Sequence, residues 1–165
     1  MGREISVSTG QVKTGSQNDL LRANGIGSCV VVVAYDLTKT VGGMAHIMLP
    51  GHAPEKGEEN PTKYAENAID ELIAGMERLG AHESEIETCL VGGGNVLRKE
   101  DDTICRANLS SIEKYLAEKG LKIRRKAVGG LLRRTVSLDI SRRCVSYTEG
   151  NSGEMELYKS VRAGN

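Results

Sequence analysis

Two apolar segments in the first third of the chain predict a pair of adjacent buried strands. Residues 30–35 (VVVVAY) are apolar at every position and mostly β-branched, which is typical of a strand covered on both faces. A polar turn at residues 36–40 separates them from a second apolar segment, residues 43–49 (GMAHIML), which Pro50 ends. This arrangement predicts a β-hairpin.

Two further segments repeat apolar residues at the spacing of an amphipathic helix. The first follows Asn60, a suitable N-cap, and Pro61, which suits the first helical position, and Gly80 is a suitable end. Its apolar positions share one face and are Ala65, Ala68, Ile69, Leu72, Ile73, Met76 and Leu79. The second helix is expected over roughly residues 106–119, before Gly120. Both apolar faces should cover a sheet.

The rest of the chain predicts more strands and no second domain. Residues 10–19 are polar and predict a loop, and the polar tail at 150–165 predicts a loose end. Strand patterns occupy residues 87–91, 121–128, 133–140 and 143–147, with weak alternation at 5–8. Six or seven strands in hairpin-like pairs predict a single-domain α/β sandwich over residues 1–165. We expect a mostly antiparallel or mixed sheet with two to three outer helices, and not a doubly wound parallel sheet.

Composition narrows the classes of function. Lys plus Arg and Asp plus Glu both number 22, so no whole-chain field attracts nucleic acid, and no Phe or Trp is present to stack on bases. The four cysteines have neither metal-ligand nor disulfide-scaffold spacing, so we expect free thiols, no metal and no cofactor. Residues 1–25 lack the apolar core of a signal peptide, and no apolar run approaches the roughly 20 residues that span a bilayer. We therefore expect a cytoplasmic protein without direct membrane insertion.

The candidate chemistry lies at the entry to the first apolar strand. Gly25 and Gly27 allow a sharp turn before Cys29, so the thiol can be exposed while the valines after it are buried. The backbone N–H groups of Ser28 and Cys29 can then stabilise an oxyanion during thiol attack. His46, in the second strand of the predicted hairpin, is the candidate base. From the pattern alone, a buried structural cysteine and a core histidine are the commoner readings of these two residues.

Two sequence blocks resemble the signature of the CheD family. They are Gly25-Ile26-Gly27-Ser28-Cys29-Val30 and Gly43-Met44-Ala45-His46-Ile47-Met48-Leu49-Pro50, in the same order and separation as in that family. The resemblance extends over roughly residues 25–140, through Lys63-Tyr64-Ala65, Gly92-Gly93-Gly94, Asn108 and Gly129-Gly130. Residues 1–24 and 150–165 lie outside it.

The resemblance implies a CheD-like fold and a protein-glutamine deamidase. Such an enzyme hydrolyses glutamine side chains on helices of methyl-accepting chemoreceptors to glutamate and ammonia, in chemotaxis adaptation, and binds the CheC phosphatase. By carry-over, Cys29 is the nucleophile that forms a thioester, and His46 is the general base and then the acid. Gly27 and Ser28 would contribute to the oxyanion and binding site.

One residue departs from the family pattern. The family commonly has a threonine six residues before the nucleophile, as a third catalytic member, and this chain has Ala23 there. Two replacements are considered: the backbone carbonyl of Ala23, which we favour as the acceptor of the His46 N–H, and the side chain of Asn24.

Two other functions compete with deamidation. One is a non-catalytic or weakly catalytic adaptor that binds CheC or receptors. The other is a receptor methylesterase-type cysteine hydrolase, because thiol attack on an ester uses the same groups.

Overall fold

The protein consists of two stacked five-stranded sheets with two helices on one outer face. The computed structural model describes residues 2–160. One sheet has the order β1-β3-β8-β9-β10 and the other β2-β5-β4-β6-β7. The strands are β1 (Glu4–Ser6), β2 (Val12–Ser16), β3 (Leu20–Ile26), β4 (Val30–Asp36), β5 (Val41–Ile47), β6 (Glu87–Gly92), β7 (Lys122–Val128), β8 (Arg134–Asp139), β9 (Cys144–Glu149) and β10 (Met155–Lys159). The helices are α1 (Ala65–Arg78) and α2 (Thr103–Glu118), with short 3₁₀ turns η1 (Pro61–Lys63) and η2 (Glu83–Glu85).

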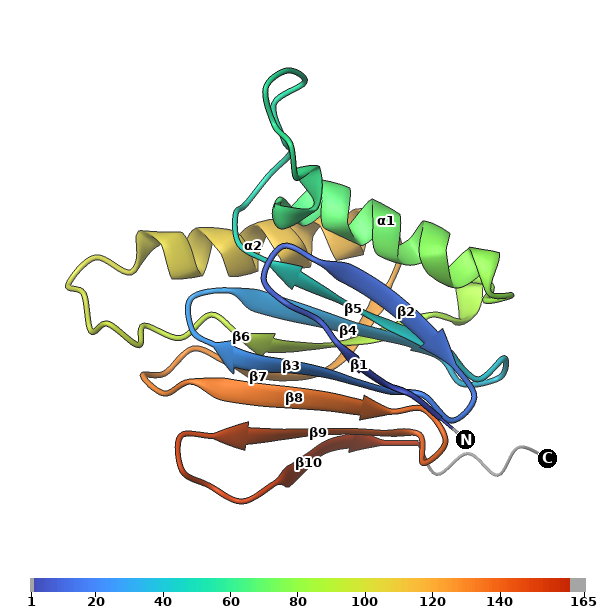
Figure 1. The fold of residues 1–165 in the computed structure, drawn as a ribbon. Coiled ribbons are helices and arrows are strands. Elements are labelled where there is room, and N and C mark those ends of the chain that lie inside the picture. Colours follow the sequence, from blue (N-terminus) through green and yellow to red (C-terminus); the bar gives the residue numbers. More distant parts are fainter. Residues whose placement is uncertain (1, 161–165) are drawn as a thin grey trace.

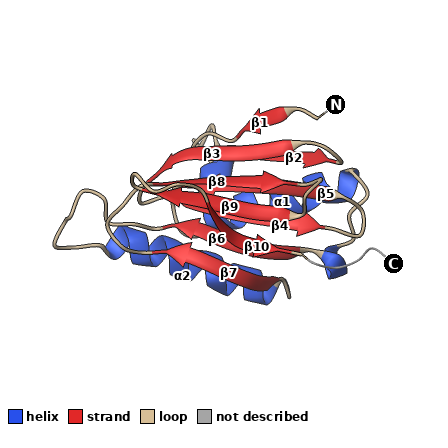
Figure 2. Cartoon of the chain, turned by 90° about the horizontal axis from the view of Figure 1, so that it is seen from below, coloured by secondary structure: helices blue, strands red, loops and turns tan. Residues whose placement is uncertain are grey.

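The layers run helices, sheet, sheet. Figure 1 shows α1 and α2 lying over the β2-β5-β4-β6-β7 sheet, and Figure 2, seen from below, shows the other sheet in front of it. In the first sheet only β1 and β3 are parallel, and in the second only β6 and β7 are parallel. This confirms the predicted α/β sandwich of mostly antiparallel, mixed sheet.

Strand β4 is the middle strand of its sheet and has a hydrophobic core on each face. All seven of its residues are buried. Val30 and Val32 pack in a core between the sheet and the helices, whereas Val31 and Val33 pack in a second core between the two sheets. A strand with a core on each face needs apolar residues at consecutive positions. The β4–β5 hairpin predicted from the sequence is confirmed, with Val31 opposite His46.

Both predicted helices are present with small changes at their ends. Pro61 begins η1 rather than the main helix, and α1 begins at Ala65 after Tyr64. Helix α2 begins at Thr103, three residues before the predicted start, and its C-cap Lys119 is followed by Gly120 in the left-handed conformation (φ +75°). Across residues 2–160, no helix is long and apolar enough to cross a membrane.

Residues 2–160 form ten strands, and three of them were not predicted. The expected number of six or seven strands is therefore wrong. The segment 10–19 holds β2, residues 20–26 form β3, and the tail that was expected to be loose holds β10. Strands β2 and β10 each lie at the edge of a sheet. An edge strand gains its hydrogen bonds from one neighbour and needs few apolar side chains, so its sequence looks like a loop. Residue 1 and residues 161–165, at the ends of the predicted domain, lie outside the described residues.

Candidate active site

Six strand ends meet at one end of the two sheets. Register places Val30 opposite both Ile47 and Gly92, and Gly92 opposite Val128, so β4 begins where β5, β6 and β7 end. In the other sheet Ile26, the last residue of β3, is opposite Arg134, the first residue of β8. The connecting loops therefore gather there, at the left-hand end in Figure 1. Loops at converging strand ends are a usual place for a functional site.

Cys29 lies in this cluster of loops, directly before β4. Its side chain is half-buried and packs against the core between the sheets. Gly93 donates a backbone hydrogen bond to the Cys29 carbonyl (2.7 Å) and Gly94 donates one to that of Gly27 (2.9 Å). A Cβ at Gly92, where φ is +124°, would lie 2.3 Å from the Cys29 carbonyl oxygen. Two of the three glycines thus hold the cysteine turn by hydrogen bonds and the third allows the close approach.

His46 shares the inter-sheet side of the sheet with Cys29. Its neighbour on β5, Ala45, packs toward the helices, and Met44 packs between the sheets, so alternation turns His46 between the sheets. It is 2% exposed and stands opposite Val31, two residues after Cys29. Diagonal neighbours on one face are within reach of longer side chains. The fold therefore brings the two predicted catalytic residues to one side of the sheet.

The ring of His46 has one bonded and one open nitrogen. Nδ1 lies 3.0 Å from the backbone carbonyl of Val7, and Nε2 is buried without a hydrogen-bond partner among the described residues. A carbonyl only accepts, so Nδ1 carries the proton and Nε2 of the neutral ring is left as an acceptor. Burial lowers the pKa of His46, and the Val7 carbonyl opposes this shift. The ring is therefore neutral near pH 7 and able to take a proton.

The partner of His46 corrects one expectation. We favoured the carbonyl of Ala23, but the structure has the carbonyl of Val7 in this place. Ala23 is fully buried in β3, where it is paired with Val136, and Asn24 is exposed. Val7 is 39 positions from His46 along the chain. Nothing local in the sequence marks Val7, since a backbone carbonyl carries no residue signature.

The thiol of Cys29 rests in its protonated form. Burial raises the pKa of the Cys29 thiol, and a hydrogen bond with the side chain of Thr9 acts to lower it. Cys29 and His46 are therefore a neutral thiol and a neutral imidazole before reaction. Such a pair needs transfer of the thiol proton to Nε2 as the sulfur attacks.

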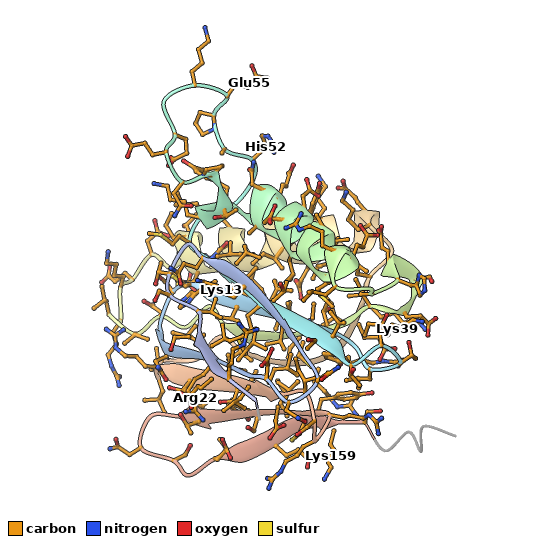
Figure 3. All side chains as sticks on the ribbon, turned by 45° about the vertical axis from the view of Figure 1, so that its right-hand side comes forward. Lys13, Arg22, Lys39, His52, Glu55 and Lys159 are labelled. Carbon is orange, nitrogen blue, oxygen red and sulfur yellow. The ribbon has the colours of Figure 1, made fainter. Side chains whose placement is uncertain are left out.

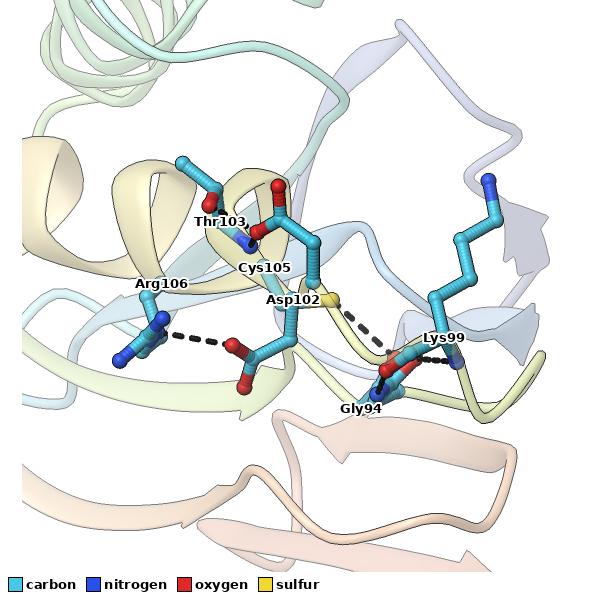
Figure 4. A network of polar contacts seen from close by, with 8 residues as sticks. Gly94, Lys99, Asp102, Thr103, Cys105 and Arg106 are labelled. Atoms are coloured by element: carbon cyan, nitrogen blue, oxygen red, sulfur yellow. Dashed lines mark hydrogen bonds and ion pairs between the residues drawn. The ribbon is translucent and has the colours of Figure 1, made fainter.

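A pocket of about 460 Å³ opens beside the cysteine turn. Gly27 and Ser28 form one side of it, and Arg133 approaches Gly27 from the β7–β8 loop. The other side is the β6–α2 loop, in which Asn95 and Lys99 are joined by two hydrogen bonds and Cys105 Sγ donates to the Gly94 carbonyl (3.5 Å). Figure 4 shows this network together with the Arg106–Asp102 ion pair (2.9 Å). The β6–α2 loop is therefore held in place by hydrogen bonds and forms one wall of the pocket.

Exposed apolar side chains surround the same end of the sheets. They come from the end of β5, the β6–α2 loop, the start of α2 and the β7–β8 loop. We call them the apolar rim: Met48, Leu97, Ile104, Leu131 and Leu132, which are 39%, 72%, 55%, 44% and 45% exposed. Exposed apolar side chains that gather around a site are typical of protein-binding surfaces.

His52, Cys89 and Cys144 stand apart from this site, whereas Cys105 borders the pocket. His52 lies in the segment that projects above the helix layer, 3.7 Å from Glu66 (Figure 3). Cys89 is buried beside Tyr35, and Cys144 begins β9, opposite Asp139 at the last position of β8. Over residues 2–160, no three His, Cys, Asp or Glu side chains are grouped to hold a metal ion.

Comparison with known proteins gives the family. The family model described as "CheD chemotactic sensory transduction" matches residues 48–148. A relative from Chlorobium luteolum, named "Probable chemoreceptor glutamine deamidase CheD", is 37% identical over 150 residues, which cover 91% of this chain and 75% of the relative. This chain belongs to the CheD family. A second CheD relative, from Halalkalibacterium halodurans and named "Chemoreceptor glutamine deamidase CheD", is 35% identical over 83% of this chain and 88% of its own length.

The family assignment confirms the resemblance found in the sequence. A further CheD relative, from Methanococcus maripaludis, is 38% identical over 70% of this chain and 75% of its own length. The residues matched by the CheD family model begin at 48, after Cys29 and His46. The roles of these two residues are therefore argued from their geometry.

The buried neutral state of His46 predicts a specific dependence of stability on pH. The unfolded chain has His46 at its ordinary pKa of 6.5, and the folded chain has it lower, so the unfolded state binds the extra proton first. The contribution of neutral His46 is fully present above pH 6.5. It is lost as the pH falls, by at most about 1.4 kcal/mol per pH unit, until the folded-state pKa is reached. Urea unfolding at pH 7.5 and 5.5 measures this loss.

Between pH 7.5 and 5.5, the free energy of unfolding should fall less in His46→Gln than in the wild type. The control His82→Gln, in the exposed turn before η2, should show the same fall as the wild type. Equal pH dependence in the wild type and His46→Gln would contradict a buried neutral histidine.

Proposed function

We propose that this CheD protein is a chemoreceptor glutamine deamidase that uses Cys29 as nucleophile and His46 as general base. Its substrate is a glutamine side chain on a methyl-accepting chemoreceptor helix, and its products are glutamate and ammonia. The observation that carries the proposal is the placement of a half-buried thiol and a buried imidazole with an open Nε2 on one side of the sheet, next to a pocket that Gly27 and Ser28 border. The relatives' names supply the substrate.

The proposed first step is attack on the carboxamide. Nε2 of His46 takes the Cys29 proton as the sulfur bonds to the carboxamide carbon, and the carbonyl oxygen becomes an oxyanion. Backbone N–H groups of the turn at Gly27, Ser28 and Cys29 would donate to it, since this turn borders the pocket. The C–N bond then breaks, and ammonia leaves with the proton held on His46. A thioester to Cys29 remains.

The second step is hydrolysis of the thioester. His46, neutral again, takes a proton from water as the water oxygen attacks the thioester carbon. The C–S bond breaks, the proton returns to Cys29, and the glutamate product is released. One water is consumed and one ammonia is formed, so the resting thiol and imidazole are regenerated.

We propose that the receptor helix lies across the apolar rim. An amphipathic helix places apolar side chains about one turn apart along one face, and the rim offers apolar partners on several sides of the cysteine turn. A glutamine between those apolar positions would then point toward Cys29. Because the proposed substrate is a helix of the cytoplasmic part of a chemoreceptor, we also propose that the protein acts in the cytoplasm.

Charged residues introduced into the apolar rim should weaken substrate binding and leave the rate of the chemical step nearly unchanged. For the double variant Leu97→Glu/Ile104→Glu we expect KM for a receptor fragment to rise about tenfold or more with kcat nearly unchanged, because each exposed apolar contact contributes about 1 kcal/mol. Steady-state ammonia release measures both constants. The matched control is Leu79→Glu, an exposed leucine (46%) at the C-terminal end of α1, far from the rim. An unchanged KM in the double variant, or an equal rise in the control, would contradict this docking surface.

The assay of the reaction itself is ammonia release from a folded chemoreceptor cytoplasmic fragment that carries its glutamines. Release by the wild type supports the deamidase. Methanol release from a methylated fragment without ammonia would favour the methylesterase. Binding of the fragment or of a CheC-type phosphatase, which we propose as a second partner, without either product would favour the adaptor.

A further inference from the structure

Strand β8 places an arginine at a position that faces the core between the two sheets. Val136 and Leu138 pack in that core, and alternation along the strand turns Arg134 to the same side. Arg134 is 6% exposed and is the first residue of β8, opposite Ile26, so it lies at the end of the sheets where the loops of the candidate site meet. A buried cation is costly unless it is paired and hydrogen-bonded, so its partners point to its role.

The guanidinium of Arg134 has partners in both sheets. Nε donates to Oε1 of Glu149 (3.0 Å), the residue directly opposite on β9, and Nη2 lies 2.9 Å from the same oxygen. Nη1 donates to the backbone carbonyls of Gly129 (2.9 Å) and Gly92 (3.3 Å). Gly92 ends β6 and Gly129 directly follows β7, so this one side chain joins β8 and β9 to the other sheet.

The bond to Gly92 connects Arg134 to the turn that carries Cys29. The peptide group between Gly92 and Gly93 accepts from Arg134 through its carbonyl, and its N–H donates to the Cys29 carbonyl (2.7 Å). The Gly92 carbonyl also accepts the backbone N–H of Gly129 (2.9 Å). Hydrogen bonds at the two ends of one peptide group polarise it and strengthen each other. Arg134 is therefore one peptide group away from the residue proposed as nucleophile.

The ion pair alone does not explain an arginine at this position. A buried ion pair can often be replaced by apolar side chains of similar volume without loss of stability. The Glu149 side chain is 36% exposed, so water can solvate its carboxylate in the absence of a partner. The two glycine carbonyls need a donor, and the planar fork of a guanidinium can serve them while it also pairs with a carboxylate.

We propose that Arg134 is a positioning residue of the candidate active site, which holds the glycine segment 92–94 and, through it, the turn of Cys29. Without its donors the Gly92–Gly93 peptide group can rotate, and the Cys29 backbone is no longer fixed relative to His46 and the pocket. A displacement of reacting groups by about 1 Å can slow a reaction about 100-fold. This role rests on the proposed function only for its effect on turnover.

The test compares two variants that break the same ion pair. Arg134→Met removes the donors to both glycine carbonyls, whereas Glu149→Gln removes only the negative charge and keeps an amide oxygen as acceptor for Arg134. We expect Arg134→Met to lower kcat for ammonia release from the receptor fragment about 10- to 100-fold with KM nearly unchanged, and Glu149→Gln to keep kcat. The matched control is Arg22→Met, which removes an arginine of β3 that pairs with Glu4, and it should also keep kcat.

The second readout is hydrogen exchange of the Gly93 amide, measured without substrate. Arg134→Met should speed this exchange about tenfold or more and leave the exchange of the β4 amides unchanged, because the effect is a local opening. Arg134→Lys keeps a positive charge beside Glu149 and replaces Arg134→Met if that variant does not fold. It should show the same two changes to a smaller extent, since an ammonium lacks the planar fork.

Where the wild type releases ammonia, an unchanged kcat in Arg134→Met would overturn the proposal, and so would an equal fall of kcat in Glu149→Gln. Because hydrogen exchange needs no substrate, it separates this proposal from the function itself. Faster Gly93 exchange in Arg134→Met, with no ammonia release by the wild type, would contradict the deamidase and leave Arg134 as the residue that holds the cysteine turn. Ammonia release by the wild type, with kcat and Gly93 exchange independent of Arg134, would do the reverse.

Discussion

Cys29→Ala should abolish deamidation of a chemoreceptor fragment, with a loss of roughly 10⁴-fold or more in kcat/KM. The reason is that the other thiol that borders the pocket, Cys105, is buried and donates its Sγ to the Gly94 carbonyl. The substitution also removes only the sulfur of a half-buried side chain that makes no structural cross-link, so the fold should be retained. Ammonia release from the fragment measures the loss, and thermal unfolding checks the fold.

Cys144→Ala is the matched control for this prediction. Cys144 has a similar intermediate burial, but it lies at the start of β9, away from the converging loops. It should keep full activity. Activity retained in Cys29→Ala, or lost equally in Cys144→Ala, would contradict the assignment of the nucleophile.

His46→Gln should lower kcat about 10²- to 10⁴-fold while KM changes little. Glutamine can keep a hydrogen bond to the Val7 carbonyl through its amide N–H, so the strand and the turn at residues 7–11 should stay in place. It has no atom that takes a proton near neutral pH, so the thiol of Cys29, whose pKa is raised by burial, would have no base. Single-turnover formation of the thioester, trapped by acid and observed as a mass adduct, measures the chemical step.

The control for His46→Gln is His82→Gln, in the exposed turn before η2. It should leave kcat unaltered. A His46→Gln enzyme with normal kcat and a tenfold higher KM would show that His46 binds substrate rather than moves the proton.

The sequence was informative where a core requires apolar side chains at consecutive or regularly spaced positions. The run of valines in β4 and the helical stripe of α1 were predicted because burial dictates their side chains. Strands β2 and β10 were missed because edge strands are held by backbone hydrogen bonds, which any residue can make. Strand β3 was missed since polar residues interrupt its apolar ones, as in its segment Arg22-Ala23-Asn24-Gly25.

The candidate site also has residues that the sequence identifies and contacts that it does not. Cys29 and His46 have functional side chains in recognisable blocks, so they could be named from the sequence. Their placement on one face depends on the register that sets Val31 opposite His46, which the sequence does not fix. The Val7 carbonyl reaches His46 only because the chain before β2 folds back along β5. Contacts of that kind are made by the fold, and no local pattern predicts them.

Attack of Cys29 on a receptor glutamine, with help from His46, is the main step of the proposed mechanism. It is tested most directly by peptide mass spectrometry of a receptor fragment incubated with the wild type, Cys29→Ala or His46→Gln. We expect conversion of specific glutamines to glutamate by the wild type alone, with a wild-type thioester adduct on the peptide that contains Cys29. Unmodified glutamines after incubation with folded wild type, or equal conversion by Cys29→Ala, would contradict it.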